Sequence, residues 1–136
     1  MRKMALISFF ALAGCLGQSG IRPLRPLEIP TAPFQDVVTK ELTGTLMYEG
    51  ECLLFREDGG AVLLMPVWPS GTIFNGTAVV FHEPGKAEQR VMIAEQFQMG
   101  GRPADWGALN AASYQPVHHQ CGAFAPFYVS SVRPAN

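Results

Sequence analysis

The sequence predicts an all-β protein whose folded part is a small antiparallel β-barrel of five or six strands. From about Val37 onward, short runs rich in β-branched, aliphatic and aromatic residues alternate with strong turn signals. The clearest turns are Asp58-Gly59-Gly60, Asn75-Gly76 and Glu83-Pro84-Gly85, where glycine readily adopts the backbone conformation of a tight reversal. Only residues 103–112 show a helical pattern, and because that pattern is weak, little helix is expected.

Residues that interrupt β-structure bound each expected strand. Glu49-Gly50 separates the first two strands, although both could belong to one long strand with a bulge at Gly50. Trp68-Pro69-Ser70-Gly71 ends the third strand, and a segment rich in Gly, Pro and Ala, 98–124, precedes the last one. The expected strands, in chain order, are 41–48, 51–56, 61–67, 77–82, 90–97 and 126–133.

This layout resembles an OB-fold, a five-stranded barrel with a long first strand, a hairpin, an interrupted middle and one long insertion before the last strand. The resemblance covers about residues 40–134 and rests on strand number and spacing. Gly44-Thr45-Leu46 and Cys52 are also similar to the opening of several families of small envelope proteins of unknown function. In such a barrel, Cys52 on the early strands could reach Cys121 and fasten the insertion to the barrel.

Composition supports a packed domain and argues against a nucleic-acid partner. Hydrophobic residues make up 48% of the chain and charged residues 15%, which is typical of a chain with a core rather than a disordered one. The formal net charge is −1, and no cluster of Lys and Arg is present that could neutralise several phosphates. We therefore expect no nucleic acid among the partners.

The N-terminus has the pattern of a bacterial export signal. Arg2 and Lys3 precede an apolar run, 4–16, which would be roughly 20 Å long as a helix and too short for a bilayer core of about 30 Å. Leu12-Ala13-Gly14-Cys15 resembles the lipobox of bacterial lipoproteins, which implies cleavage before the cysteine and attachment of lipid to Cys15. The alternatives are an ordinary secretory signal cut at a nearby alanine, and a short uncleaved anchor.

The lipoprotein resemblance divides the chain into three parts. Residues 1–14 would be the signal peptide, 15–38 the lipidated cysteine with a tether, and 39–136 the barrel domain. In the tether, Gly17-Gln18-Ser19-Gly20 is flexible, and the prolines that follow favour an extended chain, as a spacer requires. The alternative role for this region is a docking motif, Arg22-Pro23-Leu24-Arg25-Pro26.

The same resemblance implies a location. Lipoproteins of this kind carry acyl chains that hold them stably at a membrane. The residue after the cysteine is Leu16 and not aspartate, which implies the outer membrane under the best-known Gram-negative sorting rule. We therefore expect a lipid-anchored protein of the bacterial cell envelope that faces the periplasm. Its expected partners are the membrane, through the anchor, and an envelope protein or a glycan.

Cys52 and Cys121 are the cysteines that remain after Cys15. In an oxidising envelope, such a pair is expected to form a disulfide. Closing a loop of this length would stabilise the fold by roughly 4 kcal/mol in the chain-entropy model. The alternatives are two separate buried thiols, or one exposed thiol with a catalytic role.

The sequence offers little catalytic or metal chemistry. The one cluster of metal-capable side chains is His118-His119-Gln120-Cys121, but adjacent histidines on an extended segment point to opposite sides, and no second pair completes a tetrahedral site. No dinucleotide-binding, serine–lysine or zinc-protease motif is present. We therefore expect no metal, no cofactor and no enzymatic activity. A Cys121 nucleophile with His118 or His119 as its base would need a free thiol.

Aromatic residues form the remaining candidate contact surface. Trp68, Trp106 and Tyr114 lie after the third expected strand and in the long insertion, and aromatic side chains bury much area at low entropic cost. The ligand face of OB-like barrels adjoins such loops and can accept sugar rings or a peptide. The alternative is that these aromatics close the barrel ends. We favour a non-catalytic binding or accessory module, and the second hypothesis is a structural envelope protein without a small ligand.

Overall fold

The structure is a computed structural model that describes residues 29–107, 109 and 121–135. These residues form strands joined by turns and loops, so the predicted all-β class is confirmed. The strands, in chain order, are β1 (Thr31–Ala32), β2 (Lys40–Glu49), β3 (Cys52–Glu57), β4 (Leu63–Pro69), β5 (Ile73–Phe74), β6 (Ala78–Phe81), β7 (Gln89–Met92), β8 (Gln96–Pro103) and β9 (Ala125–Pro134).

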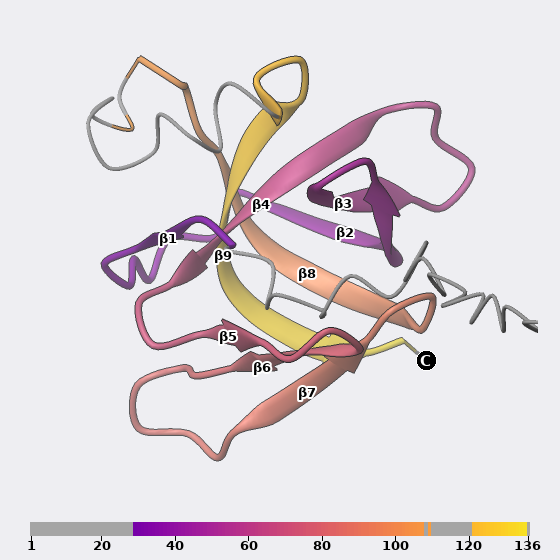
Figure 1. Cartoon of the computed structure of the whole chain (residues 1–136). Coiled ribbons are helices and arrows are strands. Elements are labelled where there is room, and N and C mark those ends of the chain that lie inside the picture. The colour runs from indigo at the N-terminus through magenta and orange to yellow at the C-terminus, as the bar shows by residue number, and fades with distance from the viewer. Residues whose placement is uncertain (1–28, 108, 110–120, 136) are drawn as a thin grey trace, which may run out of the picture.

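The strands β4, β3, β2, β8 and β9 close a barrel, and β1 adds to it at β4 (Figure 1). The long first barrel strand, β2, pairs antiparallel with β3 on one side and with β8 on the other. The last strand, β9, pairs antiparallel with β8 and parallel with β4, and this parallel pair closes the ring. A closed barrel with one parallel pair among antiparallel ones agrees with the OB-like architecture expected from the sequence.

Two glycines allow barrel strands to approach one another closely. Gly44 lies where β2 pairs with both β3 and β8, and a Cβ there would be 2.0 Å from the backbone oxygen of Arg56. Gly101 follows a bulge in the pairing of β8 with β9, and a Cβ there would be 1.8 Å from the backbone oxygen of Tyr128. Neither contact leaves room for a side chain, so both positions require glycine.

The core fills the barrel and continues under a second, smaller sheet. Alternate residues of each strand point inward, as strand geometry requires. Leu53 and Phe55 of β3, for example, join this core, whereas Leu54 between them lies in a separate cluster on the outside. The buried residues of the core are Leu46, Leu53, Phe55, Trp68, Phe74, Val79, Phe81, Val91, Phe97, Met99, Phe127, Val129 and Val132.

The small sheet, β5-β6-β7, covers one end of the barrel, below it as drawn in Figure 1. Trp68 of β4 meets Phe81 of β6 edge-to-face, with ring centroids 6.2 Å apart. At the end of β2, the Tyr48 hydroxyl donates a hydrogen bond to the backbone oxygen of Gly76 over 3.0 Å, and its ring packs on Phe74. Burial raises the pKa of the Tyr48 hydroxyl, which favours its protonated, donating form.

One expected strand, 90–97, is two strands in different sheets. β7 belongs to the small sheet and β8 to the barrel, and the chain turns between them at Ala94, which has a φ of 65°. This residue donates its N–H to the backbone oxygen of Leu46 over 3.0 Å, which ties the turn to the barrel. The rest of β8, up to Pro103, lies in the segment 98–124, which the sequence predicts as an insertion because it is rich in Gly, Pro and Ala. At Glu49-Gly50 the structure has a turn and not a bulge within one strand.

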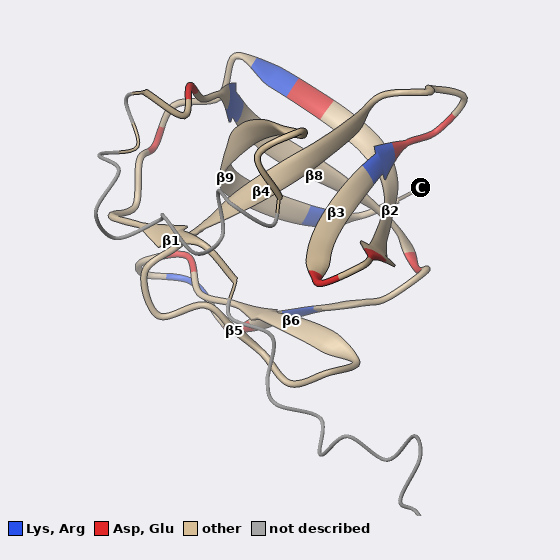
Figure 2. Cartoon of the chain, turned by 45° about the horizontal axis from the view of Figure 1, so that its top comes forward, with Lys and Arg blue, Asp and Glu red and all other residues tan. Residues whose placement is uncertain are grey.

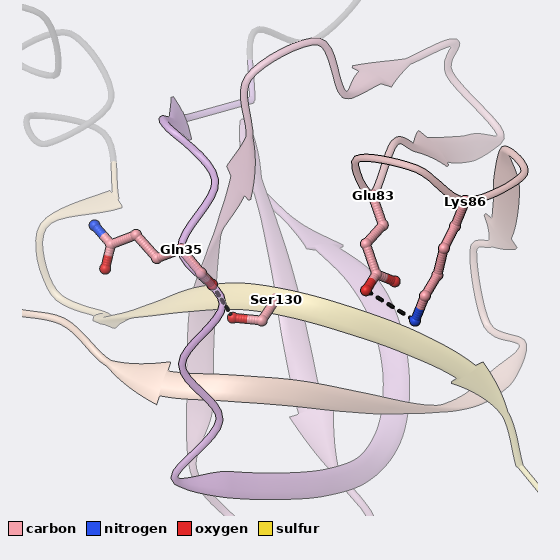
Figure 3. A network of polar contacts seen from close by, with 4 residues as sticks. All are labelled: Gln35, Glu83, Lys86 and Ser130. Atoms are coloured by element: carbon pink, nitrogen blue, oxygen red, sulfur yellow. Dashed lines mark hydrogen bonds and ion pairs between the residues drawn. The ribbon is translucent and has the colours of Figure 1, made fainter.

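The last part of the segment assigned to the tether packs on the barrel. β1 pairs parallel with β4, and the backbone N–H of Trp68 donates to the oxygen of Pro30 over 2.9 Å. Further along, the Ser130 hydroxyl on β9 donates to the backbone oxygen of Gln35 over 2.5 Å (Figure 3). The sequence predicts that the barrel domain begins at residue 39. In the structure, residues before this position already pack on the barrel.

Candidate functional site

Trp68 lies in the core and not at a contact surface. Its side chain is 1% exposed, and its indole Nε1 has no hydrogen-bond partner among the described residues. Strand alternation explains the position, because Trp68 points toward the small sheet while Val67 next to it points outward. Trp68 therefore offers no exposed ring to a ligand, and the alternative, in which an aromatic closes a barrel end, describes this residue.

Cys52 and Cys121 form the expected disulfide, with an S–S distance of 1.97 Å and Cα atoms 5.8 Å apart. It joins the first residue of β3 to the end of the insertion that precedes β9. Both cysteines are buried in a cluster with Leu54 and Met65 on the outer side of β3 and β4. A bonded cysteine cannot act as a thiolate nucleophile, so the catalytic alternative at Cys121 is not available in this state.

Trp106 holds the insertion against the barrel rather than presenting an open ring. The side chain is partly buried and packs on two outer clusters, one around the disulfide and one around Val67 and Leu109. Its Nε1 donates to the backbone oxygen of Phe124 over 2.9 Å, which links the two ends of the insertion. The third aromatic candidate, Tyr114, lies outside the described residues, as do His118 and His119.

The outer face of β3 and β4 is covered by the chain itself. In OB-like barrels this face and the adjacent loops hold the ligand. Here Leu54 and Met65 on the face are buried under the disulfide, with Trp106 and Phe124 of the insertion packed around them. The described part of the insertion therefore occupies the outer face of β3 and β4, and a ligand surface that includes Trp106 and Tyr114 stays a prediction.

We expect the Trp106→Phe variant to lose about 1 kcal/mol of stability, because it loses the hydrogen bond to Phe124 and keeps most of the apolar contact. Urea denaturation followed by far-ultraviolet circular dichroism would measure the change. A Tyr128→Phe variant is a suitable control, since no hydrogen bond of its hydroxyl is observed among the described residues. An unchanged midpoint for Trp106→Phe would show that the indole hydrogen bond does not hold the insertion.

An open cavity of about 210 Å³ lies at the other side of the molecule, between the small sheet and the barrel. Its apolar lining comes from Val91, Phe97 and Val132, which are themselves core residues. The cavity is therefore an opening toward the core, where β7 does not fully cover the strands β8 and β9. The complete lining is Gln89, Arg90, Val91, Glu95, Phe97, Val132, Arg133 and Pro134.

The other residues of the lining include four with polar side chains, and some of these lack partners. Arg90 and Arg133 are exposed, and neither makes an ion pair with a described residue. Glu95 accepts a hydrogen bond from the backbone N–H of Met92 through one carboxylate oxygen, Oε2. The side-chain oxygen of Gln89, Oε1, is buried and has no partner among the described residues. An unpartnered buried acceptor costs about 1–3 kcal/mol, so a donor placed beside it would be favourable.

The charges of the described residues are scattered over the fold rather than gathered in one area (Figure 2). The ion pairs between described residues lie in the loop between β6 and β7. One joins His82 to Glu88 over 3.3 Å. The other joins Lys86 to Glu83 over 3.0 Å and is drawn in Figure 3. Neither arginine of the cavity lining makes an ion pair with a described carboxylate, although Glu95 belongs to the same lining.

Sequence reasoning missed this cavity. Its polar residues come from the end of β9, from β7 and from the turn after β7, and no short spacing connects them. Gln89 and Arg90 belong to β7, the strand that was not separated from β8 in the sequence. The sequence does place an arginine in β7, Arg90, and another near the end of β9, Arg133. Charged residues at such positions are also common on solvated strands that bind nothing, so they do not indicate a cavity.

Metal and membrane features are absent from the described parts of the chain. Within residues 29–107, 109 and 121–135, no group of three or more His, Cys, Asp or Glu side chains could hold a metal ion. In the same residues, no helix is long and apolar enough to cross a membrane. Comparisons with protein-family models, with curated proteins and with solved structures found no match to this chain. Its function therefore rests on its own residues and their arrangement.

Proposed function

We propose that the chain is a lipid-anchored, non-catalytic binding module of the bacterial cell envelope, held at the outer membrane through Cys15 and facing the periplasm. The lipobox-like sequence Leu12-Ala13-Gly14-Cys15 supplies the anchor, and the tether after it separates the barrel from the lipid surface. The barrel would then present its open cavity to a ligand in the periplasm.

The observation that carries the proposal is the disulfide between Cys52 and Cys121. Such bonds persist in secreted and periplasmic proteins and are rare in the reducing cytosol. The export-signal pattern at the N-terminus and the bond between Cys52 and Cys121 are independent features of the chain, and both favour an extracytoplasmic location. Neither feature requires catalysis, and the disulfide takes both cysteines out of thiol chemistry.

A second candidate is a structural envelope protein without a small ligand. It is favoured by the covered outer face of β3 and β4, because Leu54 and Met65 there are buried by the protein's own insertion. A barrel whose usual ligand face is filled in this way could serve as a rigid spacer or partner for another protein. The open cavity is the observation that favours the binding module over this alternative.

We expect the full chain, expressed in a Gram-negative host, to incorporate radiolabelled palmitate and to fractionate with the outer membrane. Intact-mass measurement should give a chain that begins at Cys15 and carries acyl chains. The Cys15→Ser variant should incorporate no palmitate and leave the membrane fraction. The matched control, Cys52→Ser, should still be acylated because it lies outside the lipobox. An unmodified Cys15, or a chain that retains Met1, would contradict the proposal.

A further inference from the structure

We propose that Asn75 is a self-modification site, at which the backbone nitrogen of Gly76 attacks the Asn75 side chain and converts it to aspartate or isoaspartate in the folded protein. The two residues lie in the turn between β5 and β6. Glycine after the asparagine favours this reaction, because it places no side chain beside the attacking nitrogen. The fold adds hydrogen-bond donors that stabilise the intermediate of the reaction.

The reaction uses only the chain itself and water. The nitrogen of Gly76 loses its proton and forms a bond to Cγ of Asn75, which closes a five-membered ring between groups that the backbone already holds close together. The bond from Cγ to Nδ2 then breaks, and the amide leaves as ammonia with the proton that Gly76 lost. Water opens the resulting succinimide. Its attack at Cγ gives aspartate, and its attack at the backbone carbonyl carbon gives isoaspartate.

Three hydrogen-bond donors converge on the side-chain oxygen of Asn75, Oδ1. The backbone N–H of Thr77 lies 3.0 Å from this oxygen, the backbone N–H of Ala78 lies 2.9 Å from it, and the Thr77 hydroxyl lies 3.1 Å from it. When the nitrogen of Gly76 attacks Cγ, negative charge develops on Oδ1, as it does on the oxygen held in an oxyanion hole. Donors that are already in place stabilise this charge without reorganisation, and an unfolded chain does not hold them there.

The attacking and leaving groups of the reaction are not held by other contacts. The backbone N–H of Gly76 donates to no described residue, so its deprotonation breaks no hydrogen bond in this part of the structure. The amide nitrogen of Asn75, Nδ2, likewise has no partner among the described residues. Asn75 is exposed, so ammonia can leave and water can reach the succinimide. The side chain is therefore held through the oxygen that gains charge and not through the nitrogen that leaves.

The two products have different consequences for the fold. Aspartate keeps the oxygen that accepts from Thr77 and Ala78, so the turn is retained with an added negative charge. Isoaspartate continues the chain through the side-chain carbon, which lengthens the backbone by one atom before Gly76. The backbone oxygen of Gly76 accepts the hydrogen bond from the Tyr48 hydroxyl over 3.0 Å, and the longer backbone would displace it. Isoaspartate would therefore weaken the contact between the small sheet and the end of β2.

Peptide mapping of the full chain by mass spectrometry tests the inference. Trypsin cleaves after Arg56 and Lys86, and Asn75 is the only asparagine or glutamine between them, so a mass gain in the peptide 57–86 reports this site alone. At neutral pH, we expect deamidation to be at least about fivefold faster in the folded protein than in the same chain reduced and unfolded in guanidinium chloride. This factor corresponds to about one net hydrogen bond. A rate in the folded protein equal to or below the unfolded rate would overturn the proposal.

Variants of Thr77 test the contribution of its hydroxyl. Thr77→Val keeps the β-branched shape and the backbone N–H but removes the hydroxyl, so it should lower the ratio of folded to unfolded rates by about threefold or more. The matched control, Thr77→Ser, retains the hydroxyl and should keep the ratio. Division by the unfolded rate of the same variant removes any effect of the substitution on intrinsic reactivity, and thermal unfolding verifies that both variants fold. Equal ratios for the two variants would overturn the role of the Thr77 hydroxyl.

Discussion

Replacing Gly101 with alanine is expected to lower the free energy of unfolding by about 3 kcal/mol or more. The new Cβ would lie 1.8 Å from the backbone oxygen of Tyr128 and 2.8 Å from the ring of Phe127. A backbone oxygen cannot turn away as the end of a flexible side chain can, so β8 and β9 would have to separate. These strands join the two halves of the barrel, and their separation would disturb the ring. Urea denaturation would measure the loss.

Gly60→Ala provides the matched control. Gly60 lies in the loop between β3 and β4, where a Cβ would approach the nearest atoms, the Cβ and backbone oxygen of Glu57, only to 3.4 Å. That distance is ordinary packing, and alanine also restricts the unfolded chain, so stability should change by less than about 1 kcal/mol in either direction. If both variants lost stability equally, a general cost of replacing glycine would explain the result, and close approach of β8 to β9 would not.

The strands of the barrel and of the small sheet were predictable where turns marked them. Glycine at positive φ makes the reversals at Gly50, Gly59 and Gly76, with φ values of 62°, 70° and 100°. Strong turn residues between short apolar runs are a local signal, and the hairpin of β2 with β3 follows from it. The disulfide could also be predicted, because two cysteines remain in a chain whose N-terminal sequence has the pattern of an export signal.

Features that depend on long-range packing were not predictable in the same way. The turn at Ala94 has no Gly, Pro, Asn or Asp, so the sequence gave no reason to divide β7 from β8 there. Gly100 and Gly101 indicate a loop in the local sequence, yet the structure uses Gly101 for contact with β9 across the barrel. From the sequence, Trp68 can be either a surface contact beside the turn that follows it or a residue that closes a barrel end, and only the position of the small sheet explains its burial.

The candidate site likewise depends on long-range packing that local sequence signals do not reveal. The aromatic residues attracted attention because single side chains of this kind often contact ligands. In the structure, Trp68 and Trp106 pack against the protein itself, and the cavity is formed instead by residues of β7, β8 and β9. Arg90 and Arg133 are distant in sequence, and they belong to the lining of one cavity only because the small sheet lies across the barrel end. Such a site depends on tertiary packing, which periodicity along one strand does not describe.

Removal of the disulfide by a Cys52→Ala, Cys121→Ala double substitution should lower the free energy of unfolding by about 4 kcal/mol, the loss expected for a loop of 69 residues. The effect should also be local. Without the bond, the insertion is held only by contacts such as those of Trp106, so Leu54 and Met65 would become accessible. Binding of a fluorescent apolar dye should therefore increase below the unfolding transition. Urea denaturation and dye fluorescence, measured on the same samples, would report the two effects.

Reduction of the unmodified protein supplies the control for this last prediction. A reducing agent should shift the unfolding midpoint of the unmodified protein toward that of the double variant, and it should not change the double variant itself. The substitutions alone cannot then account for the loss, because the reduced protein retains both sulfur atoms. If reduction lowered stability but dye binding stayed constant, the insertion would remain on β3 and β4 through apolar contacts, and the disulfide would stabilise the fold without being needed to cover that face. If neither quantity changed, the bond would contribute nothing measurable, and the insertion would be fixed by Trp106 and its neighbours alone.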